Sequence, residues 1–136
     1  MSDHPTLSQN DCNVLVDFSI RLGRECWSVY RRSTPGLIRL LLLSSATVRR
    51  RAEELFQLGF GARLILCPPV DIPDPTAAAS LGETMWRACL DSMDGQIVLD
   101  GPARPDTPEI VLRRAREFFL EGFRAGSVAV REIRKS

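Results

Sequence analysis

The sequence contains one histidine, and its four cysteines are spread along the chain. The histidine is His4, in a polar N-terminal stretch, and no two cysteines form a C-x-x-C pair. Zinc fingers and related Cys/His metal sites need closely spaced ligands, so the pattern excludes this class. Each cysteine lies in an apolar stretch, where a free thiol behaves as a small hydrophobic side chain. We therefore expect no metal ligands.

The motifs of common enzyme classes are also missing. The chain has no G-x-x-x-x-G-K-[ST], G-x-G-x-x-G or G-x-S-x-G sequence, so phosphate-binding loops and nucleophile elbows are not indicated. Two carboxylate pairs, Glu53 with Glu54 and Asp91 with Asp94, have the pattern of solvated helix faces. A glycosidase-like use of either pair stays open, because the sequence does not give their separation in space. We predict that the protein is not an enzyme and has no catalytic residues and no cofactor.

No long hydrophobic run is present. The longest, Leu40 to Leu43, follows Leu37 and Ile38 and is far shorter than the roughly 20 residues that a membrane span needs. Residues 1–10 lack the apolar centre of a signal peptide. We therefore expect a cytoplasmic protein that does not contact a membrane.

Lysine is nearly absent, since Lys135 is the only one among 18 basic residues. The net charge is +1, but it is unevenly distributed. Residues 1–67 carry 9 arginines against 6 acidic residues, residues 68–109 carry 2 against 8, and residues 110–136 carry 7 basic residues against 3 acidic ones. Two basic flanks can form a basic binding face, or the acidic segment can pack beside them and neutralise them. Neutralisation is the favoured interpretation.

Apolar periodicity predicts a mainly α protein: one compact five-helix domain, residues 1–136, with one or two short β-strands. The expected helices cover residues 8–32, 35–43, 46–58, 75–93 and 107 to about 123. Short strands are expected at 62–67 and 96–99, and a proline-rich linker at 68–75 precedes a helical second half, 75–136. Helix 35–43 is apolar nearly all round apart from Arg39, so we expect it to be buried.

Capping residues mark several helix ends. Three pairs place a capping residue before a proline, which is favoured in the first helical turn. These pairs are Thr34-Pro35, Asp74-Pro75 and Thr107-Pro108. Ser44 or Ser45 can cap the helix at 46–58, and Gly59 or Gly61 can end it.

The first helix carries two apolar stripes. The first consists of Leu15, Phe18, Leu22, Cys26 and Val29, and the second of Val16, Ile20 and Trp27. A helix with two stripes must bury both, either within a monomer or partly against a second copy. Both alternatives stay open, and we predict a homodimer. Its expected interface residues are Leu15, Phe18, Leu22 and Trp27.

An arginine triplet, Arg49-Arg50-Arg51, lies in the first turns of helix 46–58, after a short helix and a tight turn. A helix-turn-helix protein places its groove-contacting residues at this position. Arginine binds phosphates and the edge of guanine through paired hydrogen bonds. Such a face is also common as a merely solvated surface. The candidate nucleic-acid contacts are the triplet and Arg63, in the expected strand.

Residues 12–67 resemble the D subunit of the flagellar master transcriptional activator (the FlhD-like family). The matching positions are Leu42, Leu43, Ser44, Ala52, Glu53, Leu58 and Arg63, with a one-residue insertion between Ala52 and Leu58. The resemblance covers about two fifths of the chain, and residues 68–136 have no counterpart in it. It implies a small helical homodimer that regulates bacterial transcription and needs a partner subunit for tight DNA binding.

Two functions are therefore predicted. The first is a small DNA-associated transcriptional regulator that acts as a dimer with a partner subunit. The alternative is a helical adaptor or chaperone-like module that binds another protein through the apolar faces of helices 8–32 and 75–93, with no nucleic-acid contact. Salt dependence separates the two, because phosphate contacts weaken steeply as salt rises.

Overall fold

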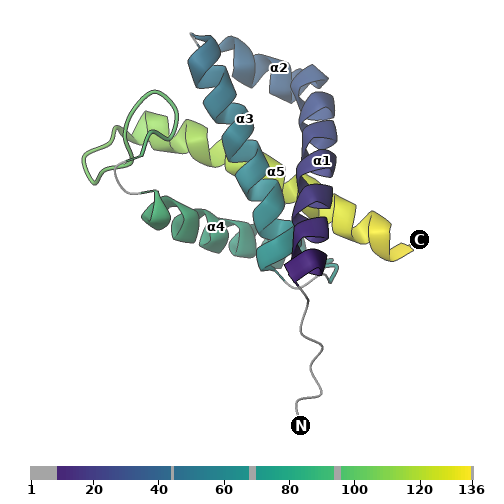
Figure 1. Ribbon diagram of the computed structural model, residues 1–136. Coiled ribbons are helices and arrows are strands. Elements are labelled where there is room, and N and C mark those ends of the chain that lie inside the picture. Colours follow the sequence, from purple (N-terminus) through teal and green to yellow (C-terminus); the bar gives the residue numbers. More distant parts are fainter. Residues whose placement is uncertain (1–8, 44, 68–69, 94–95, 136) are drawn as a thin grey trace.

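The computed structural model describes residues 9–43, 45–67, 70–93 and 96–135, and the side chains of these except at 9–12, 15, 134 and 135. The α-helices are α1 (Gln9–Arg32), α2 (Thr34–Leu41), α3 (Ala46–Gly61), α4 (Pro75–Ser92) and α5 (Glu109–Lys135). A π-helix, η1 (Ala62–Leu66), continues α3. The predicted mainly α fold with five helices is confirmed (Figure 1).

The central feature of the fold is the crossing of α3 and α5 (Figure 1). α1 packs beside α3, α2 joins the end of α1 to the start of α3, and α4 packs against α5. One hydrophobic core contains side chains from both halves of the chain, including Trp27, Phe56, Trp86 and Phe118. The proline-rich linker therefore does not separate two cores.

Glycines allow α3 and α5 to cross closely. A Cβ atom added at Gly59 would lie 1.9 Å from the backbone oxygen of Phe119, and one added at Gly122 would lie 1.9 Å from that of Phe56. Gly59 therefore packs inside a helix rather than ending one, and α5 runs through Gly122 to Lys135. Both glycines bring backbone against backbone at the centre of the core.

The inward line of α1 consists of Ser19, Gly23 and Trp27, which are all buried. A Cβ atom added at Gly23 would meet the Gln57 side-chain oxygen at 2.1 Å, so α1 lies very close to α3. Two small residues, Ser19 and Gly23, thus share the inward packing with Trp27, the one buried member of the predicted stripes whose side chain is described. Parts of those stripes remain exposed, for example Phe18 at 40%.

The strand expected at 62–67 is wrong, because the chain continues from α3 as the π-helix η1. Arg63 is buried in η1, and the Cβ of an alanine at Gly126 of α5 would lie 2.8 Å from the Cβ of Arg63. Close packing against α5 thus holds a short apolar run in helical form, where tertiary contacts override local preference. Pro68 and Pro69 lie outside the described residues.

The second expected strand, 96–99, is reduced to one antiparallel β-bridge between Ile97 and Pro102. Two hydrogen bonds close this loop, from Val98 N to Gly101 O at 2.9 Å and from Ala103 N to Gln96 O at 2.6 Å. The loop buries Val98, Leu99 and Ala103 in the core. It therefore covers the core without forming a sheet in the described part of the chain.

The capping predictions hold in part. Asp74 caps α4 by accepting a hydrogen bond from Thr76 N, and Ser45 caps α3 by accepting one from Val48 N. α2 is capped by Ser33, one residue before the predicted Thr34. The hydroxyl of Thr107 instead closes a loop, since it accepts a hydrogen bond from Arg104 N and donates one to Pro102 O. Ser44 lies outside the described residues.

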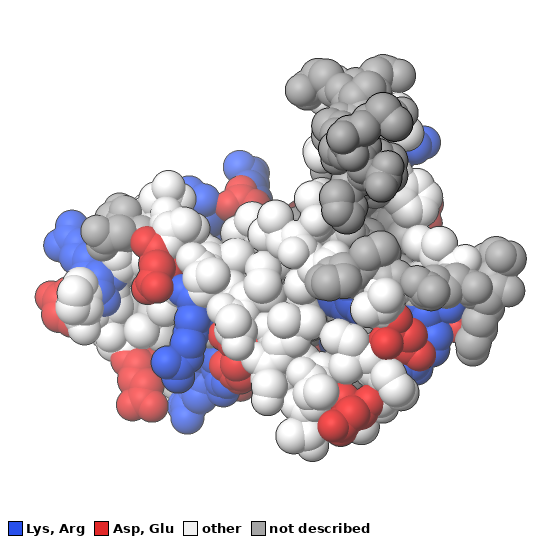
Figure 2. Space-filling view, turned by 90° about the horizontal axis from the view of Figure 1, so that it is seen from below, with Lys and Arg blue, Asp and Glu red and all other residues white. Residues whose placement is uncertain are grey.

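Charges of the acidic middle segment meet those of the basic C-terminal segment. Arg116 pairs with Glu83, and Arg131 pairs with Asp71 at 3.2 Å. These contacts fit the neutralising interpretation for part of the acidic segment. The face seen from below in Figure 2 is largely uncharged at its centre, with acidic and basic side chains toward its sides.

Candidate functional site

A groove lies between the end of α1, the whole of α2 and the start of α3, and encloses about 550 Å³. We call it the basic groove. Its lining residues are Trp27, Arg31, Arg32, Leu37, Leu40, Leu41, Ala46, Arg49, Arg50 and Glu53. In Figure 1 these three helices form an open U, with α2 across one end. The volume lies within the range of ligand and peptide sites on proteins.

The floor of the groove is apolar and fixed. Trp27 is 6% exposed, and its ring lies edge-on to Phe56 with centroids 5.3 Å apart. Leu40 is half-buried and packs against the core. Because the core holds Trp27 and Leu40 in place, the floor of the groove does not need to reorganise when a ligand binds. This reduces the entropic cost of binding.

The orientation of α2 is the reverse of the prediction. Three of its large apolar side chains and that of its C-cap residue point outward, with exposed fractions of 50% to 74%: Leu37, Ile38, Leu41 and Leu42. Leu40 alone of its leucines is half-buried. The helix is therefore not buried, and its one charged residue, Arg39, faces the protein instead. Leu37 and Leu41 belong both to this exposed face and to the groove.

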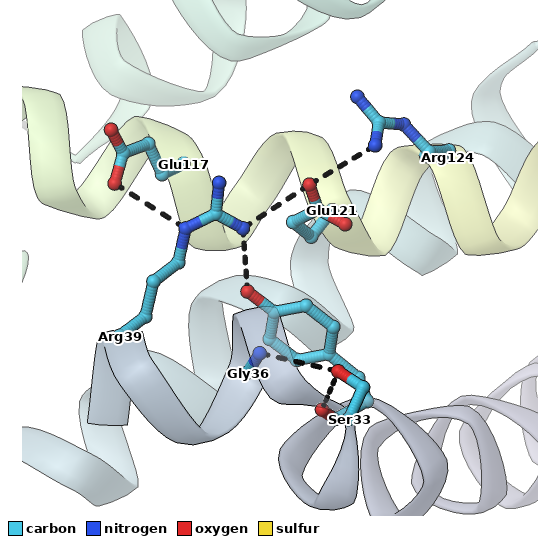
Figure 3. Close-up of polar contacts among 7 residues, drawn as sticks. Ser33, Gly36, Arg39, Glu117, Glu121 and Arg124 are labelled. Carbon is cyan, nitrogen blue, oxygen red and sulfur yellow. Dashed lines mark hydrogen bonds and ion pairs between the residues drawn. The ribbon is translucent and has the colours of Figure 1, made fainter. Parts of the chain in front are cut away.

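Arg39 holds α2 against α5 through a polar cluster (Figure 3). Its guanidinium donates a hydrogen bond to the Tyr30 hydroxyl at 2.7 Å and forms ion pairs with Glu121 at 3.2 Å and Glu117 at 3.6 Å. Arg124 also pairs with Glu121, at 3.3 Å. Burial raises the pKa of Tyr30, and the hydrogen bond from Arg39 partly opposes that rise. Both carboxylates thus lie where they can attract α2.

A tight corner fixes the angle between α1 and α2. Ser33 Oγ accepts a hydrogen bond from Gly36 N at 3.2 Å and donates one to Tyr30 O at 2.5 Å (Figure 3). A Cβ atom at Gly36 would lie 1.9 Å from Tyr30 O, so only glycine fits there. With Arg39 drawn inward and the corner fixed, Leu37 and Leu41 point away from the core, while Leu40 packs against it.

Four exposed arginines surround the apolar floor: Arg31, Arg32, Arg49 and Arg50. Arg32 donates a hydrogen bond to Ser28 O. None of the four forms an ion pair within the residues that the structure describes. Among the described residues of the lining, Glu53 is the one acidic residue, so these residues carry four positive charges and one negative charge, or +3.

The four arginines predicted to contact nucleic acid differ in their surroundings. Arg49 and Arg50 lie on the groove. Arg51 is turned aside and pairs with Glu54 at 2.8 Å. Arg63 is 1% exposed, and its guanidinium donates hydrogen bonds to Ser127 Oγ at 3.1 Å and Val70 O at 2.5 Å. A guanidinium used inside the protein does not reach a phosphate, so Arg63 is removed from the candidate contacts.

The predicted dimer interface is also corrected. Trp27 belongs to the core of the single chain, and the small part of it that is exposed lines the basic groove. Phe18 is 40% exposed, and Leu22 is half-buried at an apolar hollow of about 510 Å³ that also involves Val29 and Val128. The side chain of Leu15 lies outside the described residues. Phe18 and Leu22 therefore remain as candidates for contact with a second copy.

Sequence reasoning missed Arg31, Arg32 and the leucines of α2 as one site. A signal was present, because Arg39 is the only charged residue of an otherwise apolar helix and lies four residues before Leu43 and two after Leu37. An isolated charge in such a helix finds a partner when it is buried. Its partners, Glu117 and Glu121, are far away in the sequence, so the inward turn of Arg39 was not readable.

The chain matches no family model, no curated protein and no solved structure. The resemblance of residues 12–67 to the FlhD-like family therefore stays a prediction.

Among the described helices, none is both long enough and apolar enough to cross a membrane. Within the same residues, no group of three or more His, Cys, Asp or Glu side chains is placed to hold a metal ion.

Proposed function

We propose that the protein is a small helical adaptor that binds another protein across the basic groove and the outer face of α2. The observation that carries this proposal is the outward orientation of α2, whose Leu37, Ile38, Leu41 and Leu42 are 50% to 74% exposed. Contiguous apolar side chains on a surface are a common mark of protein interaction sites. The adaptor surface predicted from the sequence differs, because the apolar side of α4 packs on the core through Trp86.

The basic groove has the apolar centre and charged rim that are usual in a protein interface. Binding energy is concentrated in apolar and aromatic anchors that fill a central pocket, and charged side chains surround them. Here Trp27 and Leu40 supply a fixed floor, Leu41 is 74% exposed, and Arg49 and Arg50 lie at the rim. Partner side chains that enter the groove would remove this apolar surface from water.

Variant-dependent capture tests the adaptor proposal. Tagged wild-type protein and Leu41→Ser are used to capture partners from nuclease-treated lysate of the source cells. Leu66→Ser is the matched control, because Leu66 is 67% exposed and does not line the groove. We expect a protein that both wild type and the control retain and that Leu41→Ser loses, at least about tenfold. Equal retention by all three proteins would refute the proposal.

A second candidate function is a DNA-associated transcriptional regulator that acts as a dimer with a partner subunit. The observation that favours it is the cluster of four arginines that form no ion pair with any residue the structure describes, two of which lie at the N-terminal end of α3. Helix N-termini also offer backbone N–H groups to phosphates. Phe18 and Leu22 are the candidate contacts of the dimer.

Salt-dependent binding to labelled genomic duplex fragments tests this second candidate. If DNA is bound here, affinity should fall steeply with salt, and Arg49→Ala with Arg50→Ala should lower the salt slope by about 2. Arg87→Ala with Arg113→Ala, at exposed positions away from the groove, should leave the slope unchanged. Sedimentation of wild type and Phe18→Glu then shows whether α1 forms a dimer. A salt slope that is the same with and without Arg49→Ala and Arg50→Ala would exclude DNA binding in this groove.

A further inference from the structure

We infer that the occupant of the basic groove is an acidic amphipathic helix of a partner protein, with apolar residues on one face and Asp or Glu beside them. This inference rests on the proposed adaptor function and specifies the chemistry of the partner. Three features of the site carry it: its unpaired positive charge, its apolar floor, and the helical spacing of the exposed leucines.

Within the described residues, the positive charge of the groove is not neutralised. Glu53 lies four residues after Arg49 and three after Arg50, which are the spacings at which helical ion pairs form, yet neither pair is made. Arg31 and Arg32 approach from the end of α1 and add two more positive charges. Four cations around one apolar floor repel one another, and carboxylates of a ligand would relieve that repulsion.

The apolar part of the site requires more than a set of carboxylates. Leu37, Ile38, Leu41 and Leu42 follow the i, i+1, i+4, i+5 spacing of one helix face and cover about one and a half turns. Helix-in-groove recognition uses apolar anchors at i, i+3 or i+4, and i+7, which cover about two turns. A partner helix that lies along α2 can therefore place anchors over Trp27 and Leu40.

Other occupants fit these observations less well. Nucleic acid would use the arginines but would leave the exposed leucines of α2 in water. A small apolar acid would fill the floor, but it would leave Ile38 and Leu42, which lie outside the groove lining, uncovered. A helix with an acidic flank covers both parts of the surface at once. Self-association of this chain and nucleic-acid binding are outcomes that the experiment must distinguish.

A peptide-display selection tests the inference without a known partner. A random library of peptides of about 18 residues, long enough for roughly five helical turns, is selected on the wild-type protein and counter-selected on Arg49→Glu with Arg50→Glu. We expect the enriched peptides to combine Asp or Glu with apolar residues at helical spacing. Their measured affinities should fall at least about tenfold on the charge-reversed protein and should weaken as salt is raised.

Matched variants separate the possible results. Arg87→Glu with Arg113→Glu changes the net charge equally at exposed positions away from the groove, so the same peptides should keep their affinity. Circular dichroism establishes that each variant is folded, and Arg49→Ala with Arg50→Ala replaces the reversed pair if it is not. Light scattering of the protein alone, with and without Leu41→Ser, detects self-association through this face.

The inference and the proposed function can fail separately. If Leu41→Ser abolishes peptide and partner binding while charge reversal has no effect, the groove binds protein but the acidic helix is wrong. If neither change matters, both fail. Enriched peptides without acidic residues, no enrichment at all, or an affinity that does not respond to salt would each overturn the inference. Light scattering that shows only a second copy on α2 would also overturn it.

Discussion

Gly59 and Gly122 lie at the point where α3 and α5 cross, and their missing side chains set how closely the two helices pack. Each faces a backbone carbonyl of the other helix at a distance where no Cβ atom fits. Backbone cannot move aside as a flexible side chain can, so these contacts are rigid. From the sequence, Gly59 indicated a helix end, because composition does not reveal which glycine faces another helix.

Substitution of Gly59 tests this crossing. Gly59→Ala places a Cβ 1.9 Å from Phe119 O, and we expect the free energy of unfolding to fall by about 3 kcal/mol from overpacking. Gly101→Ala is the control, since nothing lies within 4 Å of its added Cβ, and its effect should stay within about 0.5 kcal/mol. Urea unfolding followed by circular dichroism measures both. Equal stability of the two variants would contradict the close crossing.

At the scale of the element, α2 shows how one polar residue orients a helix. Tyr30, Glu117 and Glu121 attract Arg39, and Leu37, Ile38 and Leu41 are left outside. Hydrophobicity alone predicts the opposite orientation. The arrangement therefore depends on ionisable groups, and stability should depend on their protonation.

The pKa of Tyr30 gives this arrangement a pH dependence. Burial raises the pKa above its ordinary value of 10.0 in the folded protein. The folded state then keeps the phenol proton longer than the unfolded state, so this contribution to stability is complete below about pH 10 and is lost as pH rises through the folded pKa. We expect the free energy of unfolding to fall as the pH rises above about 10, and to fall less in Tyr30→Phe.

Urea unfolding of both proteins across that range measures the difference. The pKa values of Cys26, Cys67 and Cys89 are also raised by burial, and they add a decline of the same sign. Because the three thiols are present in both proteins, the difference between the two curves isolates Tyr30. If the free energies of unfolding of the two proteins changed equally with pH, the predicted contribution of Tyr30 would be contradicted.

The remaining elements show what local sequence can predict. Asp74 and Ser45 begin α4 and α3 as expected, because capping depends on neighbours within three residues. The run Ala62 to Leu66 looked like a strand and is a π-helix, because Gly126 and Ser127 of α5 pack against Arg63. That contact spans 64 residues of sequence, so no local pattern reports it.

For the molecule as a whole, the sequence indicated the mainly α class but placed the interaction surface only in part. Arg49 and Arg50 were identified from the triplet, whereas Arg31 and Arg32 join them only because the corner at Ser33 turns α2 back toward α3. Trp27 and Arg63 were assigned to surfaces and belong to the interior. The sequence showed which charged and apolar residues share a helix face. Which of these faces are exposed to water depends on how the other helices pack against α5.

Site-specific photo-crosslinking tests the central claim, that the basic groove and the outer face of α2 bind a protein partner. A photoreactive phenylalanine analogue replaces Leu41 or, as the control, Leu66, both of which are mostly exposed. Illumination in the source cells should give a discrete protein adduct from position 41 and none of that mass from position 66. An adduct that nuclease removes, the same adduct from both positions, or no adduct at position 41 would contradict the account.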